Sequence, residues 1–262
     1  MTNGTDDGSM RRRVFAANWK MNHGPTSARA FTRNFVARYT PDADSEVIFF
    51  PPALSLAAAM EGVGEACPFR FGVQNIYSAD KGAFTGENSA PIAHDAGARL
   101  TLVGHSERRH VFGETNQQCA AKCAAAERAQ LLPLLCVGET LEQRERGETE
   151  AIVSQQLRIG LSELREPRVT TSIIAYEPVW AIGTGKNATA ADAAEIHTAL
   201  RGVLTELLGD AAETVRILYG GSVTPANVSE LLSAANVDGV LVGGASLKVD
   251  SWLSICSPAL NL

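Results

Sequence analysis

Ser172-Ile173-Ile174-Ala175-Tyr176-Glu177-Pro178 is the stretch of sequence that decides the fold. Its apolar residues follow one another without polar interruption, which is typical of a strand buried on both faces of a parallel sheet. Val240-Leu241-Val242 repeats this pattern later in the chain. Glu177 and Pro178 end the first run, so a carboxylate stands where a buried strand stops.

Short runs of this kind alternate with longer amphipathic segments along the chain. We expect eight strands, at residues 14–18, 47–50, 70–74, 100–104, 132–137, 172–177, 216–219 and 239–242. The clearest helical patterns cover residues 27–39, 116–130, 141–164, 190–208 and 225–234. Weaker helical candidates follow the second and third strands, and residues 246–255 close the chain. Alternating short strands and helices indicate parallel strands with crossover helices, and eight such units in about 250 residues suit a (β/α)₈ barrel. Periodicity alone leaves a doubly wound sheet as the alternative.

The barrel is expected to form a single domain over residues 13–256. No linker, low-complexity tract or change in composition divides this part of the chain. Residues 1–12 form a polar leader before it, and residues 257–262 form a short tail.

Composition excludes several classes of protein. The chain has 262 residues, 45% of them hydrophobic, and a formal net charge of −6, which argues against a nucleic-acid partner. The one basic run, Arg11 to Arg13, is interpreted as a solubilising edge. No apolar run approaches the roughly 20 residues that span a membrane, and no apolar signal core precedes the barrel. We therefore expect a cytoplasmic protein that binds neither nucleic acid nor membrane.

Five cysteines form no Cys-x-x-Cys pair. Reduced, mostly buried thiols are the simplest interpretation in a cytosolic protein. No nucleotide or metal motif is evident, so we expect no cofactor and no metal site.

Active sites of (β/α)₈ barrels lie at the C-terminal ends of the strands. The polar and glycine residues that follow the predicted strands are therefore the candidates for chemistry. They are Asn18, Lys20, Asn75, His105, Glu139, Glu177, Ser222, Gly243 and Gly244.

Glu177 is a candidate general base. Partial desolvation at the rim of an apolar barrel raises the basicity of a carboxylate. The alternative is a solvated rim glutamate or a partner in a salt bridge. His105 precedes Ser106-Glu107, and if these residues begin a helix its dipole keeps the imidazole neutral, so that its N–H can act as an electrophile. The alternative is a structural histidine.

Lys20 and the last two predicted strands point to an anionic substrate. In an extended segment Asn18 and Lys20 face the same way, with Trp19 opposite. An ammonium at the rim would attract an anion, although a surface lysine is the simpler interpretation. Tyr219-Gly220-Gly221-Ser222 and Gly243-Gly244-Ala245-Ser246 follow these strands, where barrels often bind phosphate through backbone amides. Tight turns are the alternative.

Two loops have apolar centres. Val179 to Lys186 combines an apolar middle with glycines, which favours a lid that closes over the site; permanent packing on a neighbour is the alternative. Gly82 to Glu87 carries Phe84, which needs either a partner subunit or a place within its own chain to be buried.

Taken in order, these segments resemble the triosephosphate isomerase family over residues 14–255. The segments that carry the resemblance are Asn18-Trp19-Lys20-Met21-Asn22, Gly104-His105-Ser106-Glu107-Arg108-Arg109, 175–185, 219–223 and 238–245. The resemblance implies a TIM barrel and a cofactor-free isomerase of glycolysis and gluconeogenesis that acts on a small phosphorylated triose.

The resemblance also implies the roles of individual residues. Glu177 would be the base, His105 and Lys20 would polarise the carbonyl, and Asn18 would assist them. The phosphate would be held by Lys20, Gly183, Ser222, Gly243 and Gly244. Supporting positions would be Glu107, which orients Lys20, Ile182 and Leu241, which clamp the base, and Cys136 and Tyr219. Thr85-Gly86-Glu87 would join two copies in a homodimer.

Two other functions compete with this hypothesis. One is another phosphate-binding barrel enzyme, such as an aldolase or lyase, although neither Lys20 nor Lys248 lies within an apolar strand, as a Schiff-base lysine would. The other is a barrel that only binds, which the intact base, electrophile and lid disfavour.

Overall fold

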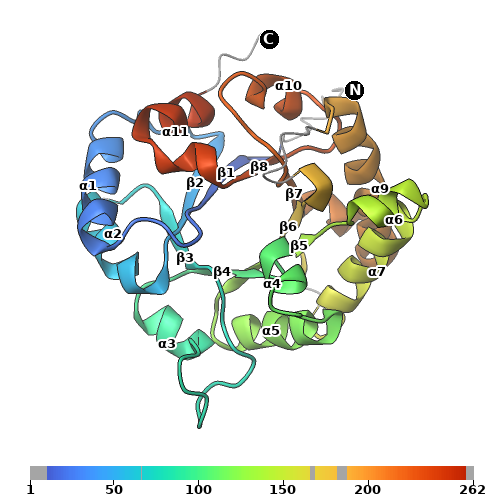
Figure 1. The fold of residues 1–262 in the computed structure, drawn as a ribbon, viewed down its shortest axis with the longest axis horizontal. Helices are drawn as coiled ribbons and strands as arrows, with labels where there is room; N and C mark the ends of the chain where they lie inside the picture. Colours follow the sequence, from blue (N-terminus) through green and yellow to red (C-terminus); the bar gives the residue numbers. More distant parts are fainter. Residues whose placement is uncertain (1–10, 66, 166–168, 182–187, 258–262) are drawn as a thin grey trace, which may run out of the picture.

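The computed structural model describes residues 11–65, 67–165, 169–181 and 188–257. Eight parallel strands close into a barrel in chain order (Figure 1). They are β1 (Arg13–Asn18), β2 (Ser45–Phe50), β3 (Arg70–Val73), β4 (Leu100–Val103), β5 (Leu132–Val137), β6 (Ile173–Tyr176), β7 (Arg216–Tyr219) and β8 (Gly239–Val242). The pairing of β1 with β8 confirms the predicted barrel and rules out the open, doubly wound sheet.

Helices form a ring around the strands, as the view down the barrel in Figure 1 shows. They are α1 (Pro25–Val36), α2 (Leu56–Val63), α3 (Ala90–Asp95), α4 (Ser106–His110), α5 (Asn116–Arg128), α6 (Leu141–Glu145), α7 (Thr149–Leu161), α9 (Ala190–Leu208), α10 (Val228–Leu232) and α11 (Val249–Cys256). Short 3₁₀ turns are η1 (Ala53–Ser55), η2 (Val179–Ala181), η3 (Gly209–Thr214) and η4 (Gly244–Leu247).

The single helix expected over residues 141–164 is wrong. Gly147 adopts φ +71°, a left-handed conformation that ends α6, and its N–H donates to the carbonyl of Arg144 at 2.9 Å. α7 then starts as a separate helix at Thr149. Glycine adopts this conformation without steric cost, so the periodic apolar pattern continues across a break in the backbone.

The buried strands separate two apolar layers. On β1, Val14 and Ala16 face the barrel interior, whereas Phe15 and Ala17 face the surrounding helices. This alternation explains why the strands read as unbroken apolar runs, since both faces of each strand are covered.

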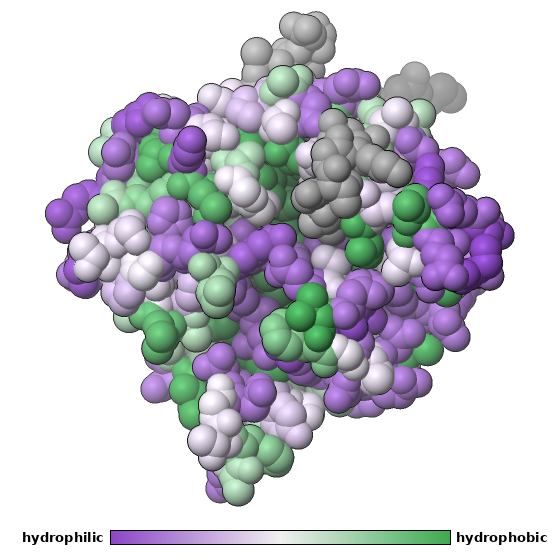
Figure 2. All heavy atoms as spheres, viewed as in Figure 1, coloured by the Kyte–Doolittle hydropathy of each residue, from purple (hydrophilic) through white to green (hydrophobic). Residues whose placement is uncertain are grey.

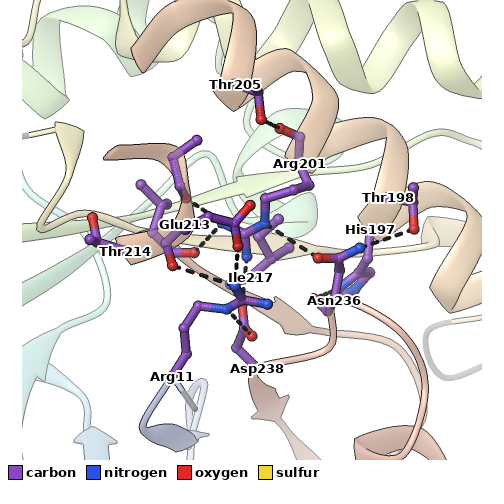
Figure 3. A network of polar contacts seen from close by, with 12 residues as sticks. Arg11, His197, Thr198, Arg201, Thr205, Glu213, Thr214, Ile217, Asn236 and Asp238 are labelled. Carbon is purple, nitrogen blue, oxygen red and sulfur yellow. Dashed lines mark hydrogen bonds and ion pairs between the residues drawn. The ribbon is translucent and has the colours of Figure 1, made fainter. Parts of the chain in front are cut away.

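A network of polar contacts closes the end of the barrel at which β8 begins (Figure 3). The buried carboxylate of Asp238 accepts hydrogen bonds from Nη2 of Arg201 on α9 at 2.8 Å, from Nε of Arg11 at 2.6 Å and from N–H of Ile217 at 2.8 Å. Arg11 also pairs with Glu213 at 2.6 Å. The interpretation of the basic run as a solubilising edge is therefore wrong for Arg11, which links the start of the barrel to η3 and β8.

The loop after β3 projects from the ring at the bottom of Figure 1, and Figure 2 shows apolar residues on it. Phe84 is 42% exposed there and packs against Tyr77, with ring centroids 4.4 Å apart. Among the described helices, none is long and apolar enough to cross a membrane.

Candidate active site

A cavity of about 320 Å³ opens at the C-terminal ends of the strands. Its lining comes from the segments that follow β1, β4, β6, β7 and β8, which are distant in the sequence. The lining residues are Asn18, Lys20, His105, Glu177, Gly220, Gly221, Ser222, Val223, Thr224, Leu241, Gly243, Gly244 and Ala245. The structure thus brings together most of the candidates that the sequence identified.

The end of β1 places Lys20 in the cavity through an unusual backbone conformation. Lys20 has φ +51°, in the left-handed region that residues with a Cβ rarely adopt. Two side chains hold this conformation: Oδ1 of Asn18 accepts the N–H of Lys20 at 3.0 Å, and Nε2 of Gln74 donates to its carbonyl at 2.8 Å. Trp19 is fully buried in the outer layer, but Lys20 is not extended as the alternation argument assumed.

The ammonium of Lys20 lies beside the candidate phosphate loops. It pairs with Oε1 of Glu107 on α4 at 2.7 Å. Its Cε lies 3.2 Å from where a Cβ on Gly243 would be, so the side chain runs directly along that backbone. The ion pair joins the two side chains, and an orienting role for Glu107 stays a prediction.

His105 ends the loop after β4 and is the N-cap of α4, the short helix expected to begin at Ser106. Its Nδ1 accepts the N–H of Glu107 at 3.2 Å, and its Nε2 lies 3.0 Å from Oε1 of Glu177. Because Nδ1 accepts, the geometry assigns the proton to Nε2, which then donates to the carboxylate.

The pKa of His105 is not lowered as the helix-dipole argument expected. Burial lowers it, but the carboxylates of Glu177 and Glu107 outweigh burial, so the pKa is raised. This effect depends on the pairing with Glu177. A backbone N–H aimed at Nδ1 still disfavours a second proton on the ring.

Glu177 follows β6 and is 2% exposed. Its Oε2 accepts the N–H of Ser106 at 2.8 Å, while Oε1 faces His105. Burial alone would raise its pKa, as the sequence argument expected. His105, Ser106 and Lys20 together reverse that effect and hold the pKa below its usual value. The expected rise in basicity is therefore wrong for the arrangement in this structure.

Two glycines leave room for the main chain and side chain of Glu177. A Cβ on Gly138 would lie 1.8 Å from the carbonyl oxygen of Glu177, and a Cβ on Gly220 would lie 2.8 Å from its Cγ. Gly138 was not among the residues predicted for the site, and Gly220 was predicted only as part of a phosphate loop. The position of both glycines at strand ends was the signal that could have shown close packing.

Four further predicted residues that the structure describes do not line the cavity. Cys136 is buried inside the barrel, and Tyr219 is fully buried in the outer layer. Glu139 turns away and accepts hydrogen bonds from Tyr176 and Trp180. Asn75 accepts one from Lys122 at 2.7 Å. Ile182 and Gly183, with the rest of the expected lid centre, lie outside the described residues.

Comparison with known proteins identifies the family of this chain. A sequence profile of triosephosphate isomerase matches residues 13–259. The chain belongs to the triosephosphate isomerase family. It is 45% identical over 250 residues to the triosephosphate isomerase of Rhodopirellula baltica, covering 95% of this chain and 98% of that one. It is 46% identical over 252 residues to that of Magnetococcus marinus, with 94% and 98% covered.

Solved structures place the chain in the triosephosphate isomerase family as well. The crystal structure of triosephosphate isomerase from Bartonella henselae superimposes with a TM-score of 0.84 at 39% identity, and the match covers 94% of this chain and 98% of that chain. Among the residues described, no cluster of His, Cys, Asp and Glu could hold a metal ion.

Proposed function

We propose that this protein interconverts dihydroxyacetone phosphate and D-glyceraldehyde 3-phosphate, through an enediolate, in cytoplasmic glycolysis and gluconeogenesis. One observation carries the proposal: a buried carboxylate, an imidazole and an ammonium line the same cavity as two glycine-rich loops. These groups suit a reaction that moves one proton on a small phosphorylated substrate.

Glu177 is the proposed base. It removes a proton from one carbon of the substrate and returns it to the neighbouring carbon. In this structure its carboxylate is held by Ser106 and His105. A substrate that takes the Nε2–H of His105 frees Oε1 of Glu177 and removes one cause of its lowered pKa, so substrate binding itself makes the carboxylate more basic.

His105 and Lys20 are the proposed electrophiles. Nε2–H of His105 and the ammonium of Lys20 donate to the substrate oxygens, where negative charge grows as the enediolate forms; Asn18 supports them. A neutral imidazole in this role is a feature for which triosephosphate isomerases are already known. Glu107 acts as a positioning residue through its ion pair with Lys20.

The phosphate is proposed to bind at the ends of β7 and β8. Backbone N–H groups of Ser222, Gly243 and Gly244 donate to its oxygens, with Gly183 completing the set. A Cβ on Gly244 would meet only open space, so this backbone is accessible from the cavity. Because the phosphate is remote from the reacting carbons, its binding energy is available to close a lid over the site.

Ile182 and Leu241 are proposed to keep the carboxylate dry when the lid is closed. Cys136 and Tyr219 are proposed to support the strand ends from within the barrel and from the outer layer. We propose the same division of the chain that the alternating pattern of strands and helices predicted. A leader covers residues 1–12, the barrel domain covers 13–256 and a tail covers 257–262.

A homodimer is proposed through the loop after β3, with Thr85-Gly86-Glu87 at its tip. Large apolar side chains are exposed on the segments that follow β1 to β4, which supports an interface on this side. They are Met21, Leu54, Phe84, Ile92, Val111 and Phe112. Exposed apolar residues grouped in this way are typical of a surface that a second protein covers.

A coupled assay of the purified protein tests the proposed reaction. We expect each triose phosphate to be converted into the other, with no metal or nucleotide beyond what the coupling enzyme itself needs. Cleavage of a fructose bisphosphate, or a substrate adduct trapped on a lysine by borohydride, would instead favour an aldolase. Binding of a triose phosphate without turnover would favour a binding protein.

A further inference from the structure

Gln156 on α7 has a buried side chain that the proposed reaction does not use. Its Oε1 accepts the N–H of Gly138 at 2.7 Å, and its Nε2 donates to the carbonyl of Gly138 at 3.0 Å. One amide therefore holds both polar groups of a single main-chain residue. Two hydrogen bonds to the same residue fix its orientation as well as its distance.

Close packing of α7 on the barrel makes this contact possible. A Cβ on Gly160, one turn after Gln156, would lie 2.5 Å from Cδ2 of Leu135 on β5. The glycine lets the helix approach the strand more closely than a residue with a side chain would. Gln156 can then reach past the end of β5 to Gly138.

Gly138 is in direct contact with the backbone of the proposed base. The carbonyl oxygen of Glu177 occupies the space that a Cβ on Gly138 would need, 1.8 Å away. The adjacent peptide units are also paired, because Glu177 N–H donates to Val137 at 2.8 Å and Val179 N–H donates to Glu139 at 3.1 Å. A rotation of the Gly138 peptide units would therefore move the main chain that carries Glu177.

We propose that Gln156 is a positioning residue for the general base. Its amide holds Gly138 in the orientation that sets the height of Glu177 above the cavity floor. The contact runs from α7 through Gly138 to Glu177, and Gln156 does not touch the cavity. The inference rests on the proposed role of Glu177. A small displacement of a reacting group, of about 1 Å, is enough to slow a reaction by about 100-fold.

The test compares Gln156→Glu and Gln156→Leu with the same substitutions at Gln155, the exposed residue that directly precedes Gln156 on α7. Ionised Glu at position 156 still accepts the Gly138 N–H but turns a second oxygen toward the Gly138 carbonyl. We expect kcat at pH 8 to fall by about 10- to 100-fold. We expect KM and the inhibition constant for inorganic phosphate to stay within about twofold, because the phosphate loops are untouched.

A pH profile distinguishes positioning from general weakening of the fold. A protonated Glu regains the donor, so the deficit of Gln156→Glu should shrink as the pH falls, while that of Gln156→Leu should not. Circular dichroism at the assay temperature supplies the folded fraction of each variant, and rates are divided by it. Wild-type kcat in folded Gln156→Glu at pH 8, or a deficit that vanishes on this correction, would overturn the inference.

Variants of Glu177 separate this inference from the proposed function. Full activity in Glu177→Asp would contradict the proposed role of Glu177 as the base, whatever the result for the Gln156 variants. Loss of activity in Glu177→Asp with normal kcat in both Gln156 variants would leave the base in place and remove only the positioning role.

Discussion

Nε2 of His105 lies 3.0 Å from Oε1 of Glu177, so the proposed electrophile and the proposed base bind each other in this structure. This contact accounts for the opposite shifts of their pKa values, raised for the imidazole and lowered for the carboxylate. In the proposed reaction, a substrate bound between the two side chains would take the place of each as the other's partner. The imidazole and the carboxylate therefore form a mutually satisfied, buried pair in this structure.

Shortening the base tests its role directly. Glu177→Asp withdraws the carboxylate by about one methylene, so kcat should fall by about 100-fold or more while the unfolding midpoint changes little. Steady-state kinetics in both directions provide the measurement. Glu150→Asp, an exposed position on α7, serves as the control. Near wild-type turnover in Glu177→Asp would exclude Glu177 as the base.

Removing the ammonium should weaken anion binding. Lys20→Met should raise the inhibition constant for inorganic phosphate by about 10- to 100-fold, the range expected for losing a charged hydrogen bond. Lys248→Met changes an exposed lysine just beyond η4 and should leave that constant unchanged. Competitive inhibition measured at fixed ionic strength makes the comparison. An unaltered constant in Lys20→Met would place the phosphate elsewhere.

Buried His197 should make stability fall in mildly acidic solution. Burial lowers its pKa to about 4, against 6.5 for the free group. The unfolded chain therefore takes up a proton that the folded chain refuses, and stability is full above pH 6.5 and declines until about pH 4. The loss is on the order of 3 kcal/mol at 1.36 kcal/mol per pKa unit.

Urea unfolding at several pH values between 7 and 4 measures how the free energy of unfolding depends on pH. His197→Gln keeps a donor for the carbonyl of Asn236, which Nδ1 of His197 contacts at 2.9 Å, but it cannot titrate. We expect its free energy of unfolding to depend less steeply on pH than that of the wild type. Identical slopes in wild type and His197→Gln would rule out this linkage.

Within the network at Asp238, breaking the buried ion pair should cost more stability than breaking the partly exposed ones. Asp238→Asn leaves the buried guanidinium of Arg201 without its counter-charge and should lower the free energy of unfolding by about 3–5 kcal/mol. Arg11→Gln breaks pairs that are partly exposed and should cost about 1 kcal/mol or less. Denaturant titration at pH 7 gives both values. Equal losses of stability in the two variants would contradict the larger contribution expected of the buried pair between Arg201 and Asp238.

A charge placed on the exposed apolar side should disrupt the proposed dimer. Phe112 is 65% exposed, so Phe112→Asp should leave the isolated fold intact and shift sedimentation toward a monomer. Leu207→Asp, on α9, introduces the same charge at an apolar position 45% exposed and should not change the oligomeric state. Monomeric wild-type protein at micromolar concentration would end the dimer proposal.

The fold and most cavity residues were predictable because they depend on local patterns. Strands such as Ser172 to Glu177 are read from consecutive residues, and barrel closure brings their ends together. Contacts between distant segments were not predictable: Arg11 and Asp238 are 227 positions apart. The shifts in pKa also escaped prediction, because the burial of Glu177 had to be weighed against neighbours that only the folded chain supplies.

The left-handed backbone at Lys20 has a consequence for engineering the protein. A non-glycine residue in this conformation costs on the order of 1 kcal/mol or more. A design that only relieved this strain would replace Lys20 by glycine and discard the cation beside the proposed phosphate loops. Thermostability screens that ignore turnover should therefore favour substitutions at this position that remove the proposed electrophile.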